Sequence, residues 1–360
     1  MAEPLKDMFG PARYRAIAEG LKAQHPAFDA DRFVALAEDG LDDLSLTQRL
    51  TRACKASRAC LPGDFRDAVA VLRAAAPDIG GGFAGVFLSE FVSLYVLDDP
   101  DFSLDALKYF TRFGSAEFAV RFFLRRDFEA TLAVMRSWAE DDNEHVRRLS
   151  SEGLRPRLPW GFQLKNLIAD PSPAFPILNR LNADAADYVR KSVGNHLNDI
   201  GKDHPEAMLD LVGGWDRSHP HTAWIVRRGL RSLVKAGDAR ALELLGFVSD
   251  VAVEVAGPDL STTSLTLGDV LRFAVEFRST ADKAQMLAVD YIVHYVRKNG
   301  SSAKVFKWRE PELAAGETVR LEKKQRFVDF STRKHHAGRH RLEVQVNGAV
   351  RAVAEFDLVT

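Results

Sequence analysis

The sequence predicts two successive architectures, an all-α array of helical repeats followed by an all-β sandwich. Up to about residue 250, apolar residues recur at three- and four-residue spacing, which is typical of amphipathic helices. After Gly257-Pro258 the pattern changes to short β-branched and aromatic runs between turn signals. Within the helical part a Val-Arg-Arg type of triplet recurs, which indicates structural repeats.

The helical part is divided by turn chemistry. Clear helical periodicity covers Arg32–Leu41, Phe65–Ala75 and Phe118–Trp138. Breaks are expected at Pro62-Gly63, Gly80–Gly82, Pro171–Pro176 and Gly213-Gly214, because Gly and Pro end regular elements. The sequence therefore predicts one helix after another up to about residue 255.

The repeated triplets begin at Val146, Val189 and Val226, about 40 residues apart. This period is that of HEAT-like repeats, in which helix pairs stack into a solenoid. Each triplet is expected to open a helix. The first Arg of each has two open interpretations, a structural contact between neighbouring repeats or a contact with a bound partner.

The second part is expected to contain about seven strands. The runs are Leu265–Phe277, Met286–Val296, Lys304–Trp308, Thr318–Phe327, Arg339–Val346 and Val350–Leu358, with turns at Lys298-Asn299-Gly300 and Asn347-Gly348. This number of short strands in about 100 residues predicts an immunoglobulin-like sandwich. The predicted domains are residues 1–255 and residues 259–360.

Composition excludes several classes of protein. The 360 residues carry a net charge of −1, and no apolar run approaches the length of a membrane span. The N-terminus lacks the apolar stretch of a signal peptide, and the two cysteines, Cys54 and Cys60, match neither a zinc site nor a redox pair. A monomeric cytoplasmic protein without metal or cofactor is expected.

Charge is segregated along the repeats. Laid over one another by their Val residues, the repeats present cations at one end of each helix and polar or acidic residues a turn further on. Basic clusters on a protein whose net charge is close to zero indicate either a groove that binds the phosphate backbone of a nucleic acid or helix faces exposed to solvent. Carboxylates within such a groove, Glu117, Glu152 and Asp199, suit the stabilisation of a positive charge. The simpler interpretation pairs each with a nearby Arg.

Four stretches carry a resemblance to a known family. They are Glu3–Phe9 (EPLKDMF), Leu107–Leu124 (LKYFTRFGSAEFAVRFFL), His145–Gly161 (HVRRLSSEGLRPRLPWG) and Asp187–Glu206 (DYVRKSVGNHLNDIGKDHPE). Residues 1–250 resemble the bacterial AlkC/AlkD-type DNA alkylation-repair glycosylases, specifically the AlkC branch. The appended sandwich resembles the longer AlkC subtype, whose extra domain helps to encircle DNA.

The resemblance implies a monofunctional DNA N-glycosylase that acts on double-stranded DNA and needs no metal or cofactor. Its implied substrates are cationic bases such as 3-methyladenine and 3-methylcytosine. By motif position, Glu117 is implied as the principal catalytic carboxylate, with Glu152, Trp160 and Asp199 around the lesion. Asn195 stands where the AlkD branch has an aromatic residue, which favours AlkC-style recognition.

A set of cationic residues and one amide is expected to bind DNA. Such binding would associate the protein with the nucleoid in a bacterial cytoplasm. In the helical part these are Arg121, Arg148, Arg155, Lys165, Arg190, Lys191, Asn195, Arg227 and Arg228, and in the sandwich Lys323, Lys324, Arg333, Lys334 and Arg339. Two rival functions stay open, a non-catalytic HEAT scaffold that binds nucleic acid or protein, and a carbohydrate- or peptide-binding sandwich.

Overall fold

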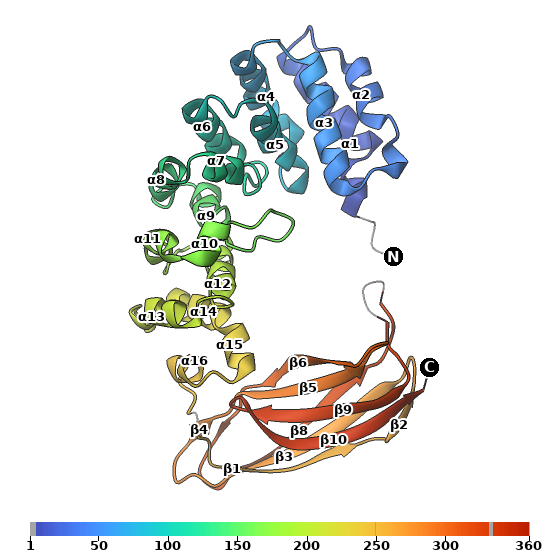
Figure 1. Cartoon of the computed structure of the whole chain (residues 1–360), viewed down its shortest axis with the longest axis vertical. Coiled ribbons are helices and arrows are strands. Elements are labelled where there is room, and N and C mark those ends of the chain that lie inside the picture. The colour runs from blue at the N-terminus through green and yellow to red at the C-terminus, as the bar shows by residue number, and fades with distance from the viewer. Residues whose placement is uncertain (1–4, 249, 331–333, 360) are drawn as a thin grey trace. The chain divides into compact units, whose positions relative to one another are not determined.

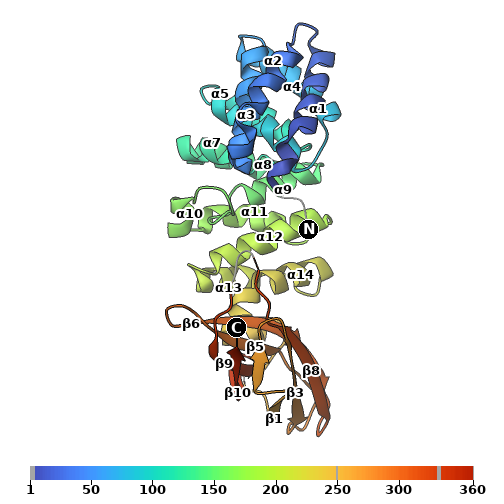
Figure 2. The same ribbon diagram turned by 90° about the vertical axis from the view of Figure 1, so that its right-hand side faces the viewer.

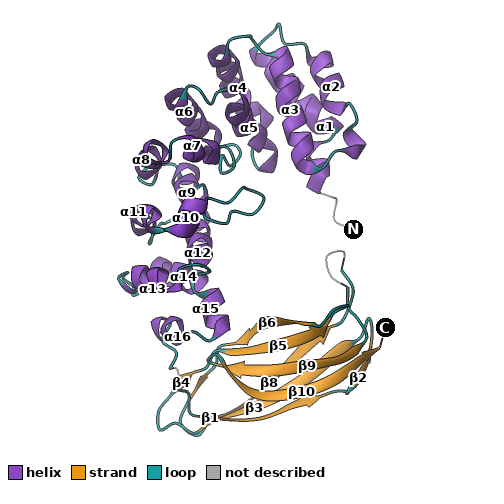
Figure 3. Ribbon diagram, in the orientation of Figure 1, coloured by secondary structure: helices purple, strands orange, loops and turns teal. Residues whose placement is uncertain are grey.

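The computed structural model describes residues 5–248, 250–330 and 334–359. It confirms the two-part architecture, with helices first and strands after them (Figures 1 and 3). The chain forms two compact units. The first comprises Met1–His204 with Gly214–Gly229, and the second Pro205–Gly213 with Leu230–Thr360. None of the described helices is long and apolar enough to cross a membrane.

The first unit is built from helices stacked in two layers. Its elements are η1 Leu5–Phe9, α1 Pro11–Gln24, α2 Ala30–Glu38, η2 Leu41–Asp43, α3 Leu46–Cys60, α4 Phe65–Ile79, η3 Phe83–Gly85, α5 Val86–Tyr95, α6 Pro100–Phe110, α7 Val120–Arg126, α8 Phe128–Trp138, α9 Glu144–Glu152, α10 Lys165–Ala169, η4 Ser172–Ala174, α11 Phe175–Arg180, α12 Asp187–Ile200 and α14 Pro220–Gly229. Helices α4, α6, α8 and α11 form one layer, and α5, α7, α9, α12 and α14 the other (Figures 1 and 2). The loop between α9 and α10, residues 153–164, projects from the second layer.

Side-chain caps explain where several helices begin. The carboxylates of Asp29, Asp64, Asp99 and Asp127 each accept a hydrogen bond from a backbone N–H in the first turn of the next helix. The single helix predicted over 118–138 is therefore wrong, since Asp127 ends α7 and caps α8. Periodicity continues across the break because both helices bury apolar residues.

The triplets mark equivalent positions in α9 and α12, but Val226 lies in the second half of α14, so the expectation that each opens a helix is wrong there. The first Arg of the first triplet, Arg147, makes the structural contact between neighbouring repeats. The Arg147 guanidinium donates to both carboxylate oxygens of Asp184, at 2.7 and 3.0 Å, ahead of the next repeat. Arg190, the first Arg of the second triplet, donates instead to the carbonyls of Asp184 and Ala185 in the turn that leads into its own helix, α12.

The second unit contains three helices and the sandwich. Its elements are α13 Pro205–Gly213, α15 Arg231–Ala236, α16 Ala239–Leu244, β1 Val253–Leu260, β2 Ser264–Thr266, β3 Val270–Ser279, β4 Gln285–Met286, β5 Val289–Val296, β6 Ser301–Arg309, β7 Glu312–Leu313, β8 Thr318–Arg326, β9 Gly338–Val346 and β10 Ala349–Val359. A three-stranded sheet, β1-β3-β8, faces a five-stranded sheet, β2-β10-β9-β5-β6, across an apolar core. The strand pair β2-β10 is parallel and the other pairs are antiparallel.

The strands differ from expectation at their N-terminal side. Strand β1 begins at Val253, so Gly257-Pro258 lies inside a strand, at the register shift between Ala256 and Asp259. Proline is tolerated there because a bulge interrupts the ladder. The predicted run over 265–277 is two strands, separated at Gly268 (φ 108°). The predicted Asn347-Gly348 turn joins β9 to β10, with both residues at positive φ.

Candidate functional site

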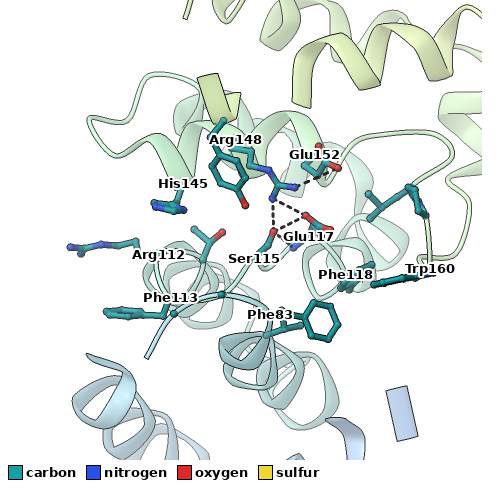
Figure 4. Close-up of a pocket in the computed structure, with 18 of the residues that line it drawn as sticks. Phe83, Arg112, Phe113, Ser115, Glu117, Phe118, His145, Arg148, Glu152 and Trp160 are labelled. Atoms are coloured by element: carbon teal, nitrogen blue, oxygen red, sulfur yellow. Dashed lines mark hydrogen bonds and ion pairs between the residues drawn. The ribbon is translucent and has the colours of Figure 1, made fainter. Parts of the chain in front are cut away.

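A pocket of about 510 Å³ opens in the first unit (Figure 4). Its walls come from the glycine-rich segment 81–83 with Val86, the turn 111–118 after α6, three residues along α9 (His145, Arg148 and Glu152), loop residues 155 and 158–160, and Tyr188 of α12. Of the four residues implied as catalytic, Glu117, Glu152 and Trp160 line this pocket. The fourth, Asp199, is buried behind it.

Two glycines bring the first walls together. A Cβ atom on Gly114 would lie 2.3 Å from the carbonyl carbon of Gly85, and one on Gly85 would lie 2.6 Å from the Phe113 oxygen. Only a residue without Cβ permits this backbone approach. The contact sets the turn that carries Ser115 and Glu117 against the segment that carries Phe83.

Glu117 is held by one of its two carboxylate oxygens. Its Oε2 atom accepts a hydrogen bond from the Ser115 hydroxyl at 2.7 Å and pairs with Nη1 of Arg148 at 2.8 Å. That Arg148 nitrogen also donates to the Ser115 hydroxyl at 2.8 Å. Both interactions end on Oε2, which leaves Oε1 without a hydrogen bond to any described residue. With 14% of the side chain exposed, Glu117 can offer this oxygen to a ligand in the pocket.

The ion pairs continue inward from Arg148. Glu152 Oε1 lies 3.5 Å from Arg148 and 2.7 Å from Arg155. Arg155 pairs with Asp199 at 2.8 Å, and Asp199 also pairs with Lys202 at 2.9 Å. Burial opposes the charge of both arginines, but their carboxylate partners outweigh it and raise the pKa of each guanidinium. Arg148 and Arg155, expected to hold DNA, are therefore engaged with carboxylates.

Trp160 stands at the pocket mouth with 69% of its surface exposed. Its backbone has φ 65°, in the left-handed region that a bulky residue rarely adopts. The edge of Phe83 approaches the indole, with the ring centroids 6.0 Å apart. An exposed indole in the same pocket as a carboxylate can stack on a base or a cation.

Arg121 corrects a prediction. Expected to contact DNA, it is 0% exposed, and its guanidinium donates to the carbonyls of Gly153, Arg155 and Phe162. Burial, with a smaller contribution from the Arg155 charge, lowers its pKa to about 10. Arg121 thus ties both ends of loop 153–164 to α7 and cannot reach a phosphate from this position.

The other predicted DNA-binding residues are spread over both units. Lys165, Lys191 and Arg227 are exposed in the first unit, and Asn195 and Arg190 are half-buried. The Arg228 guanidinium lies 5.5 Å from the Trp224 ring. In the second unit Lys324, Lys334 and Arg339 are exposed and Lys323 is half-buried, whereas Arg333 lies outside the described residues.

Several pocket residues were not predicted. Arg112, His145 and Phe118 line it, and the Arg148 guanidinium lies 4.4 Å from the ring of Tyr188. Tyr188 directly precedes the second repeated triplet, a position that the repeat alignment could have singled out. Among the described residues, no group of three or more His, Cys, Asp or Glu side chains is arranged to hold a metal ion.

Comparison with known proteins gives consistent matches. The family described as "DNA alkylation repair enzyme" matches residues 107–233, and "Uncharacterised protein YhaZ, C-terminal Ig-like domain" matches residues 254–360. The uncharacterized protein YhaZ of Bacillus subtilis is 36% identical over 98% of this chain and 99% of its own length. The alkylpurine DNA glycosylase AlkC of Pseudomonas fluorescens, solved bound to DNA containing an abasic site analog, is 46% identical. That similarity covers 99% of this chain and 100% of the other, with a TM-score of 0.97.

Proposed function

Because this chain belongs to the AlkC branch of the DNA alkylation repair enzymes, we propose that it is a monofunctional DNA N-glycosylase. It hydrolyses the N-glycosidic bond of cationic N3-alkylated bases, such as 3-methyladenine and 3-methylcytosine, in the double-stranded DNA of a bacterial cytoplasm. The observation that carries the proposal is the Glu117 carboxylate, anchored through one oxygen and open at the other, in a pocket with an exposed indole.

The chemistry demands little proton transfer to the leaving group. An N3-alkylated purine already carries a positive charge, so its bond to the sugar breaks with development of an oxocarbenium-like cation. A fixed carboxylate stabilises that cation and orients the attacking water. Oε1 of Glu117 takes this role, since Ser115 and Arg148 hold Oε2 in place.

The remaining residues have supporting roles. Glu152 fixes Arg148, and Asp199 fixes Arg155, so that the carboxylates of the inner chain act through the arginines that they bind. Trp160 packs against the lesion or its sugar. None of the described residues that line the pocket is a lysine, which fits hydrolysis without a Schiff-base step.

The test is single-turnover release of 3-methyladenine from duplex DNA. Glu117→Gln keeps the shape of the side chain and removes its charge, and we expect excision to slow by at least about a hundredfold, the scale for loss of one charge-stabilising group. Glu129→Gln is the matched control, an exposed carboxylate on α8 outside the pocket. Near-equal rates for wild type and Glu117→Gln would remove Glu117 from the mechanism, and DNA binding without any base release would favour a scaffold.

The sandwich supplies a second DNA contact in this proposal. Lys323 and Lys324 lie on β8, and Lys334 and Arg339 lie near the start of β9. Cations of this kind bind phosphates without reading sequence. Lys323→Gln/Lys324→Gln should weaken duplex binding and reduce its salt dependence. Unchanged affinity at each salt concentration would rule out a DNA contact through these two lysines.

A further inference from the structure

A second pocket, of about 650 Å³, shares loop 153–164 with the candidate site. Loop residues 158–160 line the candidate site, and the residues that follow, from Phe162 on, line the second pocket. Its complete lining is Leu124, Arg125, Phe128, Phe162, Gln163, Leu164, Lys165 and Asn166. The second pocket is therefore formed by the C-terminal end of α7, the first residue of α8, the last residues of the loop and the N-terminal end of α10.

The pocket combines an apolar floor with a polar rim. Leu124 and Leu164 are buried, and Phe128 and Phe162 are half-buried. The rim consists of exposed Arg125, Gln163, Lys165 and Asn166. Rings and aliphatic groups beneath cations and amides suit a ligand with a planar or sugar-like body and an anionic group.

Arg125 is held in place by aromatic rings. Its guanidinium carbon lies 5.2 Å from the ring centroid of Phe122 and 4.8 Å from that of Phe162. The two rings themselves meet edge to face at 5.4 Å. Such stacking orients the guanidinium and leaves its N–H groups available for an anion.

The two cations of this pocket, Arg125 and Lys165, differ from neighbouring cations in their charge partners. Among the described residues, no carboxylate lies within 4.0 Å of Arg125 or Lys165. The neighbouring Arg126 pairs with Asp98 at 2.7 Å, and Arg157 of the same loop pairs with Asp203 at 2.8 Å. Two uncompensated cations at one pocket raise the local potential, which favours an anionic ligand.

We propose that this pocket binds a nucleotide of the substrate DNA that flanks the lesion, an assignment that rests on the proposed DNA glycosylase function. Arg125 and Lys165 hold its phosphate, and the rings of Phe128 and Phe162 pack against its sugar or base. The occupant contacts the loop that carries Trp160, and Arg121 already ties the Phe162 carbonyl to α7. The pocket therefore sets the register of the DNA strand along the loop.

The experiment measures binding of a duplex that contains a tetrahydrofuran abasic analogue. Fluorescence anisotropy is recorded between about 50 and 200 mM salt for wild type, Arg125→Gln/Lys165→Gln, and a matched control. The control, Lys22→Gln/Arg136→Gln, removes the same charge from exposed positions on α1 and α8. Circular dichroism establishes that each variant is folded.

We expect the pocket variant to bind DNA roughly tenfold more weakly than wild type. The slope of log affinity against log salt should become less steep by about 1 to 2, because two phosphate-binding cations are removed. The control should keep the wild-type slope. Because the pocket positions the strand and does not touch the reacting atoms, the excision rate at saturating enzyme should change far less than the affinity. Equal slopes for the pocket variant and the control would overturn the proposal.

A second experiment distinguishes a nucleotide within DNA from a free mononucleotide as the ligand of this pocket. Fluorescently labelled deoxyadenosine monophosphate is titrated into wild type and the pocket variant. If only wild type binds the free nucleotide while DNA binding is the same for both, the pocket is a mononucleotide site and the DNA assignment is wrong. Base release by wild type is scored independently. Its absence would refute the glycosylase, while a reduced slope in the pocket variant would still support a DNA contact.

Discussion

Replacing Arg121 by methionine should release loop 153–164 from α7, the helix that carries Arg121. The Arg121 side chain is fully buried and donates to three backbone carbonyls, with Nη1 at 2.9 Å from the Gly153 oxygen and 2.8 Å from the Arg155 oxygen. Nε donates to the Phe162 oxygen at 3.0 Å. Methionine fills much of the same volume but donates no hydrogen bond, so each carbonyl loses its donor.

The magnitude follows from the burial of those carbonyls. The hydrogen bonds to Gly153 and Arg155 are buried, whereas those to Phe162 are partly buried and water can replace them. An unsatisfied buried group costs about 1–3 kcal/mol, so two cost about 2–6 kcal/mol. Removing a buried charge whose pKa burial has already lowered to about 10 offsets part of this cost. We expect a net loss of about 3 kcal/mol.

Urea unfolding and thermal melting measure this loss. A change of about 3 kcal/mol corresponds to a melting temperature lower by roughly 6–12 °C for a unit of this size. Trypsin should cleave faster within the released loop, after Arg157, since the bond between Arg155 and Pro156 resists trypsin. Arg126→Met is the control, since its ion pair with Asp98 is exposed and contributes little. A loss below about 1 kcal/mol for Arg121→Met, with unchanged proteolysis, would refute the reasoning.

Two further predictions concern the interior of the first unit. Gly114→Ala should destabilise by about 1–3 kcal/mol in thermal melts, because its Cβ would meet the Gly85 backbone at 2.3 Å. Gly63→Ala, where an added methyl would meet no described atom within 4 Å, should leave stability nearly unchanged; equal effects would contradict the close-contact argument. Burial, with the Arg155 charge, lowers the pKa of His196 to about 3. In the unfolded chain His196 takes up a proton below its ordinary pKa of 6.5, whereas in the folded protein it stays neutral down to about pH 3. The free energy of unfolding therefore decreases as the pH is lowered from 6.5 to 3, and the loss is about 2 kcal/mol at pH 5. His196→Gln should flatten urea-derived stability between pH 7 and 5, and a slope like that of wild type would assign the loss to other groups.

Most of the fold could be predicted from the sequence because its two signals are local. A three- to four-residue period and a two-residue period depend only on neighbours in the chain. Predictions failed where a single side chain interrupts a pattern, as Asp127 does between α7 and α8. They also failed at β1, because a strand that contains Gly257-Pro258 looks like a linker until its bulge is seen.

The candidate site could be predicted only in part. The motif around Glu117, Glu152 and Trp160 identified three residues that do line one pocket. The sequence could not show that Arg121 points inward, since its helix position does not reveal that a loop more than 30 residues further on covers it. Nor did it show that Gly85 and Gly114 touch and so bring the Phe83 segment into the wall.

By itself, the sequence determined the two architectures, the period of the repeats and the kinds of side chain that the repeats present. Only the tertiary structure decided which cations are paired and which are left for a ligand. Arg155 reaches Asp199 across 44 residues of chain and Arg148 reaches Ser115 across 33, whereas Arg125 and Lys165 have no carboxylate within 4.0 Å among the described residues. The physical reason is that Coulomb attraction depends on distance in space, and helix packing sets that distance.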